Sequence, residues 1–342
     1  MHEALLYEHK SEAAVRCGLC PHACLIPDGG TGRCGVRANR GGTLYSLVYG
    51  RSIAEHVDPI EKKPLFHVLP GSRSYSIATA GCNLNCRHCQ NADIAHLPRL
   101  RGVPDADQRP PEAIVAAALA TGSRSISCTY TEPTVYFEYA RDIAACAREA
   151  GLKTVFVTNG FITPAAVEMI APFLDAANID LKAFSDGFYR DICGARLQPV
   201  LDAIRCYRRC GIWIEITTLI ISGLNDSPDE LQQAADFIAA LGEDVPWHVS
   251  AFYPAHRMAD RPPTAPAALH AARAIGLAAG LRYVYTGNIP GQGGEDTLCH
   301  ACGALLIRRR GYAVASRAAR GGVCPDCGAY CAGIFNHAEA MP

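Results

Sequence analysis

Three cysteines in one short stretch are the residues of this sequence best placed to do chemistry. Cys82, Cys86 and Cys89 follow the spacing C-x3-C-x2-C, directly after a β-like run over residues 74–80. A structural zinc site takes four protein ligands, and a cubane iron–sulfur cluster takes one thiolate per iron. Three thiolates on a 4Fe–4S cluster would leave one iron open to a ligand. The alternatives are an incomplete zinc knuckle and a chance grouping among 17 cysteines.

The whole chain gives a broad frame for this site. Its 342 residues suffice for one large domain with small appendages. A net charge of −1 gives no global case for nucleic acid or a membrane as the main partner. The start of the sequence lacks a basic region followed by an apolar one, and no apolar run approaches the length of a membrane span. We therefore expect a cytoplasmic protein with neither signal peptide nor membrane span.

A second group of cysteines lies near the start of the chain. Cys17, Cys20, Cys24 and Cys34 have the spacing C-x2-C-x3-C-x9-C among glycine-rich turns. Clustered thiols in a reducing compartment indicate metal binding. Four thiolates complete the coordination of a zinc ion or of an auxiliary iron–sulfur cluster, and the sequence does not choose between them. The alternatives are free buried cysteines and a redox disulfide between Cys17 and Cys20.

A third group lies near the end of the sequence. Two Cys-x2-Cys knuckles, each followed by glycine, contain Cys299, Cys302, Cys324 and Cys327. This pattern is typical of a zinc ribbon, and a metal would stabilise a segment too small to fold easily by itself. We therefore predict three parts: an N-terminal cysteine-rich metal-binding module over residues 1–50, a catalytic domain over 51–290, and a zinc-ribbon-like module over 291–342.

The middle of the chain alternates between strand-like and helix-like runs. The strand-like runs begin near residues 74, 125, 153, 177, 213, 247 and 282. Helix-like runs lie between them, several with proline, serine or threonine at their start. This alternation is typical of parallel strands joined by right-handed crossover helices. The pattern predicts an α/β fold with a partial (β/α)6 TIM-type barrel.

Polar side chains cluster where these strands end, which is where a parallel barrel carries its chemistry. The candidate residues are Tyr130, Glu132, Asn159, Asp180, Lys182, Thr218 and His248. Asp180 and Lys182 also have a simpler interpretation as an ordinary ion pair. Cys193 follows the fourth strand and is a candidate catalytic hydrogen donor.

The motifs together resemble a known family. The spacing of Cys82, Cys86 and Cys89 is the signature of radical S-adenosylmethionine (radical SAM) enzymes. Thr-Asn-Gly at 158–160 and Asp-x-Lys at 180–182 look like the activating enzymes of glycyl radical enzymes. The sequence is similar to the AmmeMemoRadiSam system radical SAM enzymes, which are named for their association with AMMECR-domain and Memo-like proteins. The matching stretches are residues 17–24, 58–65, 130–134, 218–226, 246–248 and 283–288.

The resemblance implies a cofactor set and a reaction. A 4Fe–4S cluster would bind S-adenosylmethionine at its open iron, and one electron from flavodoxin or ferredoxin would yield a 5'-deoxyadenosyl radical. His88 stands where the family usually has an aromatic residue against the adenine. The strand-end residues named above, other than Cys193, would help to bind S-adenosylmethionine. Activating enzymes often carry Gly-Gly-Glu after the second strand, where it binds the methionyl amino group. The Gly-Gly-Glu at 293–295 follows the last strand instead, so we do not assign it this role.

Two kinds of function follow from the sequence. The first is a radical SAM enzyme that abstracts hydrogen from a peptide or protein, or else from a small molecule with AMMECR-type and Memo-type partners. The second is a non-catalytic metal-binding scaffold. Fold and cofactor chemistry are shared by many reactions, so the sequence does not name the substrate.

Overall fold

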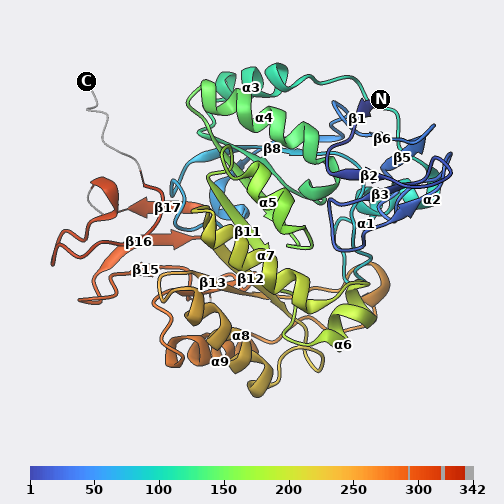
Figure 1. Ribbon diagram of the computed structural model, residues 1–342. Helices are drawn as coiled ribbons and strands as arrows, with labels where there is room; N and C mark the ends of the chain where they lie inside the picture. Colours follow the sequence, from blue (N-terminus) through green and yellow to red (C-terminus); the bar gives the residue numbers. More distant parts are fainter. Residues whose placement is uncertain (292, 317–319, 336–342) are drawn as a thin grey trace.

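An eight-stranded sheet forms the centre of the computed structural model, which describes residues 1–291, 293–316 and 320–335 (Figure 1). Seven neighbouring strands run parallel, and only the pair at one edge is antiparallel. In sheet order the strands are β14 (Val284–Gly287), β13 (Trp247–Ala251), β12 (Trp213–Ile220), β11 (Ala176–Asp180), β10 (Lys153–Thr158), β9 (Ser125–Cys128), β8 (Arg73–Ala78) and β7 (Ala54–Pro59).

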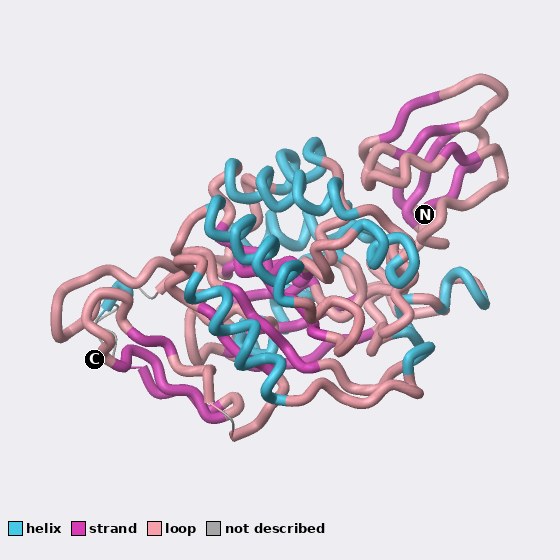
Figure 2. The backbone as a smooth tube through the Cα atoms, turned by 90° about the horizontal axis from the view of Figure 1, so that it is seen from below, coloured by secondary structure: helices cyan, strands magenta, loops and turns pink. Residues whose placement is uncertain are grey.

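Six crossover helices cover the outer face of this sheet (Figure 2). They are α3 (Pro111–Ala120), α4 (Phe137–Glu149), α5 (Pro164–Ile170), α7 (Leu197–Arg209), α8 (Pro228–Leu241) and α9 (Pro266–Ala278). Four of them begin with proline, whose fixed φ suits the first helical position and whose missing N–H has no partner there. The predicted α/β alternation is therefore confirmed, with six helices and seven parallel strands.

One edge of the sheet was missed by sequence reasoning. β7 pairs antiparallel with β8, from Ala54 opposite Ala78 to Pro59 opposite Arg73. Most of its side chains are exposed or half-buried, so it shows no clear apolar pattern. A strand at the edge of a sheet can leave many of its side chains exposed, so its sequence lacks the regular apolar pattern by which a strand is predicted. β7 and β14 do not pair with each other, so the barrel is open along one side.

The N-terminal module lies at one end of the barrel (Figure 1). It contains two small antiparallel sheets, β2-β3-β4 and β1-β6-β5. The six strands are β1 (His2–Glu3), β2 (Tyr7–His9), β3 (Val15–Cys17), β4 (Leu25–Ile26), β5 (Arg37–Arg40) and β6 (Thr43–Ser46). Arg37 fixes the module to α4 through two hydrogen bonds to Glu138, of 2.8 and 3.0 Å, and both side chains are 2% exposed.

The C-terminal module lies at the opposite end (Figure 1). Its antiparallel sheet has the order β15 (Thr297–Leu298), β16 (Leu305–Arg310) and β17 (Ala313–Ser316). The buried guanidinium of Arg309 donates to the Phe66 carbonyl at 2.7 Å and lies 4.1 Å from the Phe66 ring centroid and 5.8 Å from that of Tyr285. Phe66 follows β7 and Tyr285 lies in β14, so this module joins the regions beside both unpaired edges.

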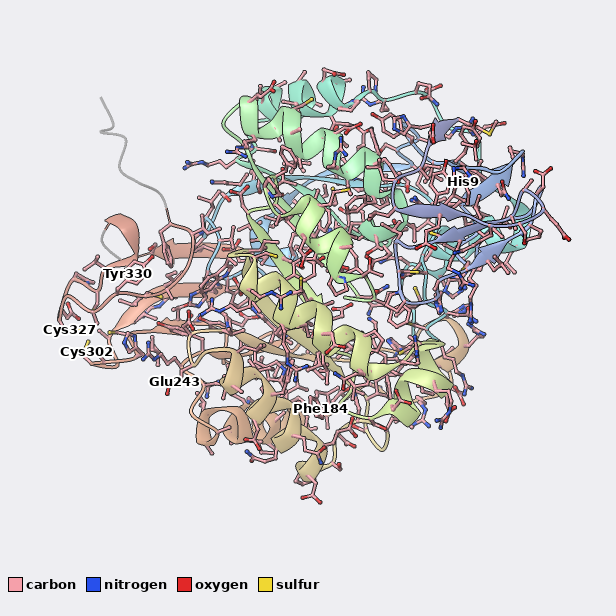
Figure 3. The ribbon with its side chains drawn as sticks, viewed as in Figure 1. His9, Phe184, Glu243, Cys302, Cys327 and Tyr330 are labelled. Atoms are coloured by element: carbon pink, nitrogen blue, oxygen red, sulfur yellow. The ribbon has the colours of Figure 1, made fainter. Side chains whose placement is uncertain are left out.

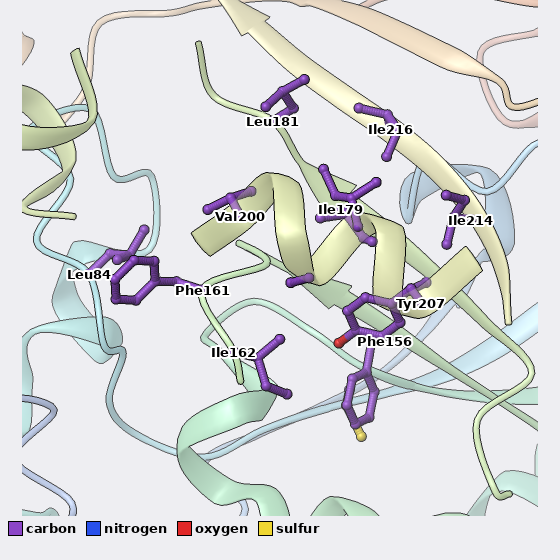
Figure 4. Close-up of a cluster of buried hydrophobic side chains, with 14 of the residues drawn as sticks. Leu84, Phe156, Phe161, Ile162, Ile179, Leu181, Val200, Tyr207, Ile214 and Ile216 are labelled. Atoms are coloured by element: carbon purple, nitrogen blue, oxygen red, sulfur yellow. The ribbon is translucent and has the colours of Figure 1, made fainter. Parts of the chain in front are cut away.

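The hydrophobic core lies between the sheet and its helices and extends to the cysteine loop. Figure 4 shows Ile179, Ile214 and Ile216 of the sheet facing Val200 and Tyr207 of α7. Leu84, from the loop that carries the three cysteines, belongs to the same buried cluster and lies beside Phe161 (Figure 4). The loop is thus anchored in the core by an apolar side chain.

Candidate active site and cysteine sites

The loop after β8 carries Cys82, Cys86 and Cys89. Cys86 is buried, and the other two are half-buried. Gly81 begins the loop with a φ of +108°, a conformation that favours glycine, and a Cβ there would lie 2.7 Å from a methyl carbon of Val36. The N-terminal module therefore packs directly against the start of this loop.

Backbone and arginine contacts fix the path of the loop. The N–H groups of Asn85 and Arg87 each donate to a carbonyl of the segment 192–193, both at 2.9 Å. Arg99 donates to the Cys82 carbonyl at 2.6 Å and also to the Leu84 carbonyl. Arg257 donates to Asn85 at 2.7 Å. The three thiols are therefore held by elements from several parts of the barrel.

The thiols open onto a cavity of about 550 Å³ at the carboxyl ends of the strands. Its volume falls within the range of small-molecule and cofactor sites. Among the predicted site residues, those lining it are Cys82, Cys86, His88, Cys89, Tyr130, Glu132, Asn159, Asp180 and Lys182. Three thiols without a fourth in the lining, beside polar groups and a roomy cavity, fit a 4Fe–4S cluster together with S-adenosylmethionine.

Glu132 and Asn159 form a hydrogen-bonded unit behind the loop. The fully buried Glu132 carboxylate accepts from the Asn159 N–H at 2.8 Å, from the hydroxyls of Thr134 and Thr158 at 2.6 and 2.7 Å, and from the Thr134 N–H at 3.0 Å. Burial raises the pKa of Glu132, although these bonds oppose the shift. The Asn159 amide lies 3.6 Å from the Cys82 sulfur. Glu132 thus joins two strand ends, and Asn159 connects them to a candidate ligand.

Asp180 and Lys182 lie together on the cavity wall. Their side chains form an ion pair of 2.8 Å between Nζ and Oδ2, and they are 34% and 14% exposed. Although burial opposes the shift, the charge of Asp180 raises the pKa of Lys182, so the ammonium stays protonated. Asp180 and Lys182 therefore form an ordinary ion pair and also face the cavity, so both interpretations from the sequence apply to them.

A cluster of charged side chains forms the wall beside Tyr130. Asp58 accepts from Lys62 and Lys63 at 2.8 and 2.6 Å and also from the Tyr130 hydroxyl. Although burial opposes the shift, these bonds hold the pKa of Asp58 well below its usual range. Burial lowers the pKa of Lys63 to about 8. Tyr130 has a φ of +62°, a strained value for a tyrosine that commonly accompanies functional sites.

His88 lies in the cysteine loop with its ring 6.2 Å from that of Phe188. It is 5% exposed, and its Nδ1 has no hydrogen-bond partner among the described residues. Burial and then the charge of Lys182 lower the pKa of His88 to about 3, so the ring is neutral. A flat neutral ring with a free polar atom at the cavity suits a ligand that stacks and accepts or donates a hydrogen bond.

Two predicted cofactor-binding residues do not line the cavity. Thr218 donates to the Leu181 carbonyl at 2.9 Å and accepts from Trp247 at 3.0 Å. Its neighbours Thr217 and Leu219 line the cavity instead, because successive side chains of a strand face opposite sides. His248 is buried against Glu215, with 2.6 Å between Nε2 and Oε2. The structure therefore corrects the predicted placement of Thr218 and His248.

The structure also corrects the placement of Cys193. We expected this residue to face the site, but it is fully buried and does not line the cavity. Its carbonyl accepts from the Asn85 N–H, and its thiol donates a hydrogen bond to the sulfur of Cys86. Cys193 therefore supports the cysteine loop from behind, which leaves it badly placed to give hydrogen to a substrate.

The four N-terminal cysteines surround a separate small cavity. Cys17 and Cys34 are buried and Cys20 and Cys24 are half-buried. The same cavity is bordered by Asn83 of the loop that carries Cys82, Cys86 and Cys89, called the catalytic loop below, and by Thr134 and Val135 of the barrel. The structure thus brings all four predicted thiols to one place, directly behind this loop.

The four C-terminal cysteines form a tighter group. Their sulfur atoms all lie within 4.8 Å of one another, with 3.6 Å between Cys299 and Cys327 and 3.7 Å between Cys302 and Cys324. Cys302 and Cys327 lie side by side at the outer end of the module (Figure 3). Although burial opposes the shift, backbone N–H groups and the neighbouring thiols lower the pKa of Cys299 to about 7. These four cysteines are able to bind a metal.

Sequence reasoning did not identify several residues of the main cavity as site residues. Lys62, Lys63 and Tyr312 line it, and Asp58 holds the two lysines. The lysines follow the unpredicted strand β7, so no strand end pointed to them. Tyr312 is 60% exposed at the turn between β16 and β17. The C-terminal module therefore supplies part of the cavity wall, a long-range contact that no local pattern signals.

The cavity and the parallel sheet define a class of enzyme, and the sequence comparison agrees. The model of the radical SAM superfamily matches residues 76–238, which include the cysteine loop. An uncharacterized protein of Methanocaldococcus jannaschii is 43% identical over 313 residues, covering 90% of this chain and 92% of that protein. The chain belongs to the radical SAM superfamily, whose members are enzymes. Membership implies a 4Fe–4S cluster and S-adenosylmethionine.

More distant relatives share parts of the chain. The pyruvate formate-lyase 1-activating enzyme of Escherichia coli is 19% identical over 175 residues, covering 49% of this chain and 71% of that enzyme. A radical SAM methyltransferase from Sphaerobacter thermophilus has a TM-score of 0.50 at 16% identity, covering 69% of this chain and 71% of that one. These similarities support the fold. No helix among the described residues is long and apolar enough to cross a membrane.

Proposed function

We propose that this enzyme reductively cleaves S-adenosylmethionine and uses the resulting radical to abstract hydrogen. The observation that carries the proposal is the group of three thiols, Cys82, Cys86 and Cys89, at a cavity of about 550 Å³ on the strand ends. The cluster and S-adenosylmethionine together supply a 5'-deoxyadenosyl radical when one electron arrives. We infer that flavodoxin or ferredoxin supplies that electron.

The chain's own side chains would hold and orient the cofactor. Asp180 and Lys182 offer a carboxylate and an ammonium for its amino and carboxylate groups, and Asn159 fixes the path of the loop through Cys82. His88 offers a flat neutral face for the adenine. Glu132 acts as a positioning residue, because the protein's own donors occupy its carboxylate.

The test is anaerobic assay of the full chain with dithionite and S-adenosylmethionine. We expect 5'-deoxyadenosine, and we expect it to disappear in the variant with Cys82, Cys86 and Cys89 all changed to alanine. The variant with Cys206 of α7 and Cys210 at its C-terminal end changed to alanine is the matched control and should retain the activity. Cleavage that persists in the triple variant would refute the assignment.

For the substrate we favour a peptide or protein. Tyr312 supports this, because a separate module reaches the cavity and leaves an exposed aromatic side chain at its wall. A relative is named for activating pyruvate formate-lyase, which is itself a protein. We further propose membership of the AmmeMemoRadiSam system, with AMMECR-domain and Memo-like proteins as partners. The alternative is a small substrate supplied by those partners.

The choice between substrates can be tested at Tyr312. Purified AMMECR-domain and Memo-like proteins are added to the full chain, and the stimulation of 5'-deoxyadenosine formation is measured. Tyr312→Ala should reduce the stimulation by a macromolecule, whereas Tyr330→Ala, an equally exposed tyrosine of the same module, should not. Absence of binding and stimulation would remove the partner proposal. Stimulation by a small molecule that is unaffected by Tyr312→Ala would favour the alternative.

We propose that the chain has three functional parts, residues 1–50, 51–290 and 291–342, and that the last is a zinc ribbon. The end of the third part, 336–342, lies outside the described residues. Four thiolates around one zinc at about 2.3 Å require sulfur separations of about 3.8 Å, close to the 3.6 and 3.7 Å present here. Metal analysis should show one zinc lost in the variant with Cys302 and Cys327 changed to alanine. Unchanged zinc would contradict the proposal.

A further inference from the structure

The N-terminal cysteine site resembles an iron–sulfur site more than a zinc site. We propose that Cys17, Cys20, Cys24 and Cys34 hold a second 4Fe–4S cluster. All four thiols line one cavity. Four cysteines suit a zinc ion and an iron–sulfur cluster equally in their chemistry. The arrangement of the sulfur atoms therefore has to decide between them.

The C-terminal site shows what a single-metal site looks like in this protein. Its four sulfurs all lie within 4.8 Å of one another. In residues 1–291, 293–316 and 320–335, no three of the N-terminal thiols come together in this way, although each of them is described. A tetrahedron around one ion needs every pair of sulfurs to be close. The N-terminal thiols are therefore spread more widely than those of the C-terminal site.

The catalytic loop shows the other kind of arrangement. Cys82, Cys86 and Cys89 likewise form no such close group within the described chain. A cubane places each thiolate on its own iron, so its ligands stand farther apart than those of one zinc. This comparison rests on the proposed function, because it takes the catalytic cluster as its standard.

The spacing in the sequence strengthens the likeness. The run Cys17–Cys20–Cys24 has the spacing C-x2-C-x3-C, the reverse of the C-x3-C-x2-C in the catalytic loop. Each run places three thiols within eight residues. In the N-terminal module Cys34 adds a fourth thiol, so this cluster would be fully ligated by protein. It would therefore store an electron rather than bind S-adenosylmethionine.

The walls of the cavity suit an anionic cluster. Arg33 and Arg37 line it, Arg37 being paired with Glu138 outside the lining, and none of the described lining residues is acidic. A cluster with four thiolates carries net negative charge, and nearby cationic groups stabilise it in a site of low dielectric constant.

The site also lies beside the catalytic loop. Asn83 borders the cavity and directly follows Cys82. Its carbonyl shares a hydrogen bond of 2.9 Å with His22, and its side chain accepts from Asn159 at 2.9 Å. A second cluster here would be separated from the catalytic one by little more than this residue. This short separation would suit electron transfer from the second cluster to the catalytic one.

Metal analysis of the full anaerobic protein tests the inference. Two 4Fe–4S clusters and one ribbon zinc predict about eight irons and about one zinc per chain. A total of about four irons and two zincs would overturn the proposal, as would about four irons and one zinc. About six irons would also overturn it, because the site would then hold a smaller 2Fe–2S cluster.

Two variants show which site holds which cluster. Changing Cys20 and Cys24 to alanine should leave about four irons, with a reduced-cluster EPR spectrum that still changes when S-adenosylmethionine is added. Changing Cys82, Cys86 and Cys89 to alanine should also leave about four irons, with a spectrum that ignores S-adenosylmethionine. Loss of all iron from the second variant refutes the inference. If instead the first variant loses the response to S-adenosylmethionine and the second keeps it, the proposed function fails.

Discussion

The two terminal modules each carry a group of four cysteines, but they differ in which parts of the chain build the site. In the C-terminal module each knuckle closes on itself: Gly303 donates to the Cys299 carbonyl, and Gly328 to that of Cys324, both at 2.9 Å. Both glycines have a φ near +75°, which favours glycine. In the N-terminal module the thiols surround a cavity that the barrel helps to wall. One site is complete within its own module, and the other is shared with the catalytic domain.

This difference shows how far a cysteine motif can be interpreted alone. Where the ligand geometry is made by local turns, spacing predicts the site, as for the four C-terminal cysteines. Where the geometry depends on another domain, spacing gives the ligands but not the metal. We expect changes in the shared site to reach the catalytic loop, and changes in the self-contained site to stay local.

The largest expected effect concerns activity. Changing Cys20 and Cys24 to alanine should lower 5'-deoxyadenosine formation with dithionite about a hundredfold, because a shift of the loop behind Cys82 by about 1 Å has consequences of that size. Changing Cys302 and Cys327 should lower it far less. Initial rates of the two variants, measured at equal protein concentration, provide the check. Equal losses would mean that the two sites affect catalysis alike.

The next effect concerns how each module is attached. Arg37→Ala leaves Glu138 buried without its partner at 2.8 Å. Arg309→Ala leaves the Phe66 carbonyl without its donor and the buried Glu61 without a cation that lies 4.0 Å away, a longer and weaker contact. Removing one member of a buried pair lowers the free energy of unfolding by about 3–5 kcal/mol, so Arg37→Ala should have the larger effect. Urea denaturation measures both. Arg310→Ala, whose ion pair is exposed, is the control and should change stability by less than about 1 kcal/mol.

A smaller effect should depend on pH. His67 joins the barrel to the C-terminal module, with 2.7 Å from Nδ1 to the Ala332 carbonyl and 2.7 Å from Nε2 to the Tyr285 hydroxyl. Burial lowers the pKa of His67 from 6.5 to about 4. Between these values the unfolded chain binds more protons than the folded one, so stability should fall as the pH drops from 6.5 towards 4, by at most about 3 kcal/mol.

Denaturation at several pH values isolates this contribution. His67→Phe should flatten the profile between pH 6.5 and 4, whereas His9→Phe, at an exposed position of the N-terminal module, should leave it unchanged. An unaltered profile in the His67 variant would show that another group is responsible.

The smallest effect concerns the knuckle glycines. Gly303 has open space around its missing Cβ and a φ of +75°, so a substitution meets backbone strain alone. Gly303→Ala should lower stability by about 1–2 kcal/mol and speed the release of metal to a chelator. Gly303→Asn should have a milder effect, because asparagine tolerates this conformation better. Chelator titration compares them. Equal behaviour of both variants would argue against a conformational origin.

Much of the fold could be predicted from the sequence, because the signals were local. Apolar runs of strand length between capped helices indicated the α/β alternation, and the helices over Pro111–Ala120 and Pro228–Leu241 do begin with a proline, one of the start signals in the sequence. β7 gave no such signal, since an edge strand with exposed side chains resembles a loop.

The residues of the candidate site also differ in how well local sequence predicts them. The cysteine loop and the strand ends at Asp180 and Lys182 reach the cavity as their positions in the sequence predicted. Thr218 does not, because a one-residue step along a strand reverses the direction of the side chain. His248 lies on the same strand face as Ser250, which does line the cavity, but two residues deeper in the barrel, where its ring pairs with Glu215. Tyr312 reaches the cavity through tertiary packing of a distant segment, which no spacing reveals.

The bridge made by Arg309 bears on how the protein is made. Residues beside both edges of the sheet contact this one buried side chain, which is encoded late in the sequence. During translation the strands of the barrel leave the ribosome before Arg309 does. Until the bridge is made, the Phe66 and Tyr285 rings, 4.8 Å apart, lack the cover of this side chain, and a clipped chain without it would expose them to chaperones and proteases.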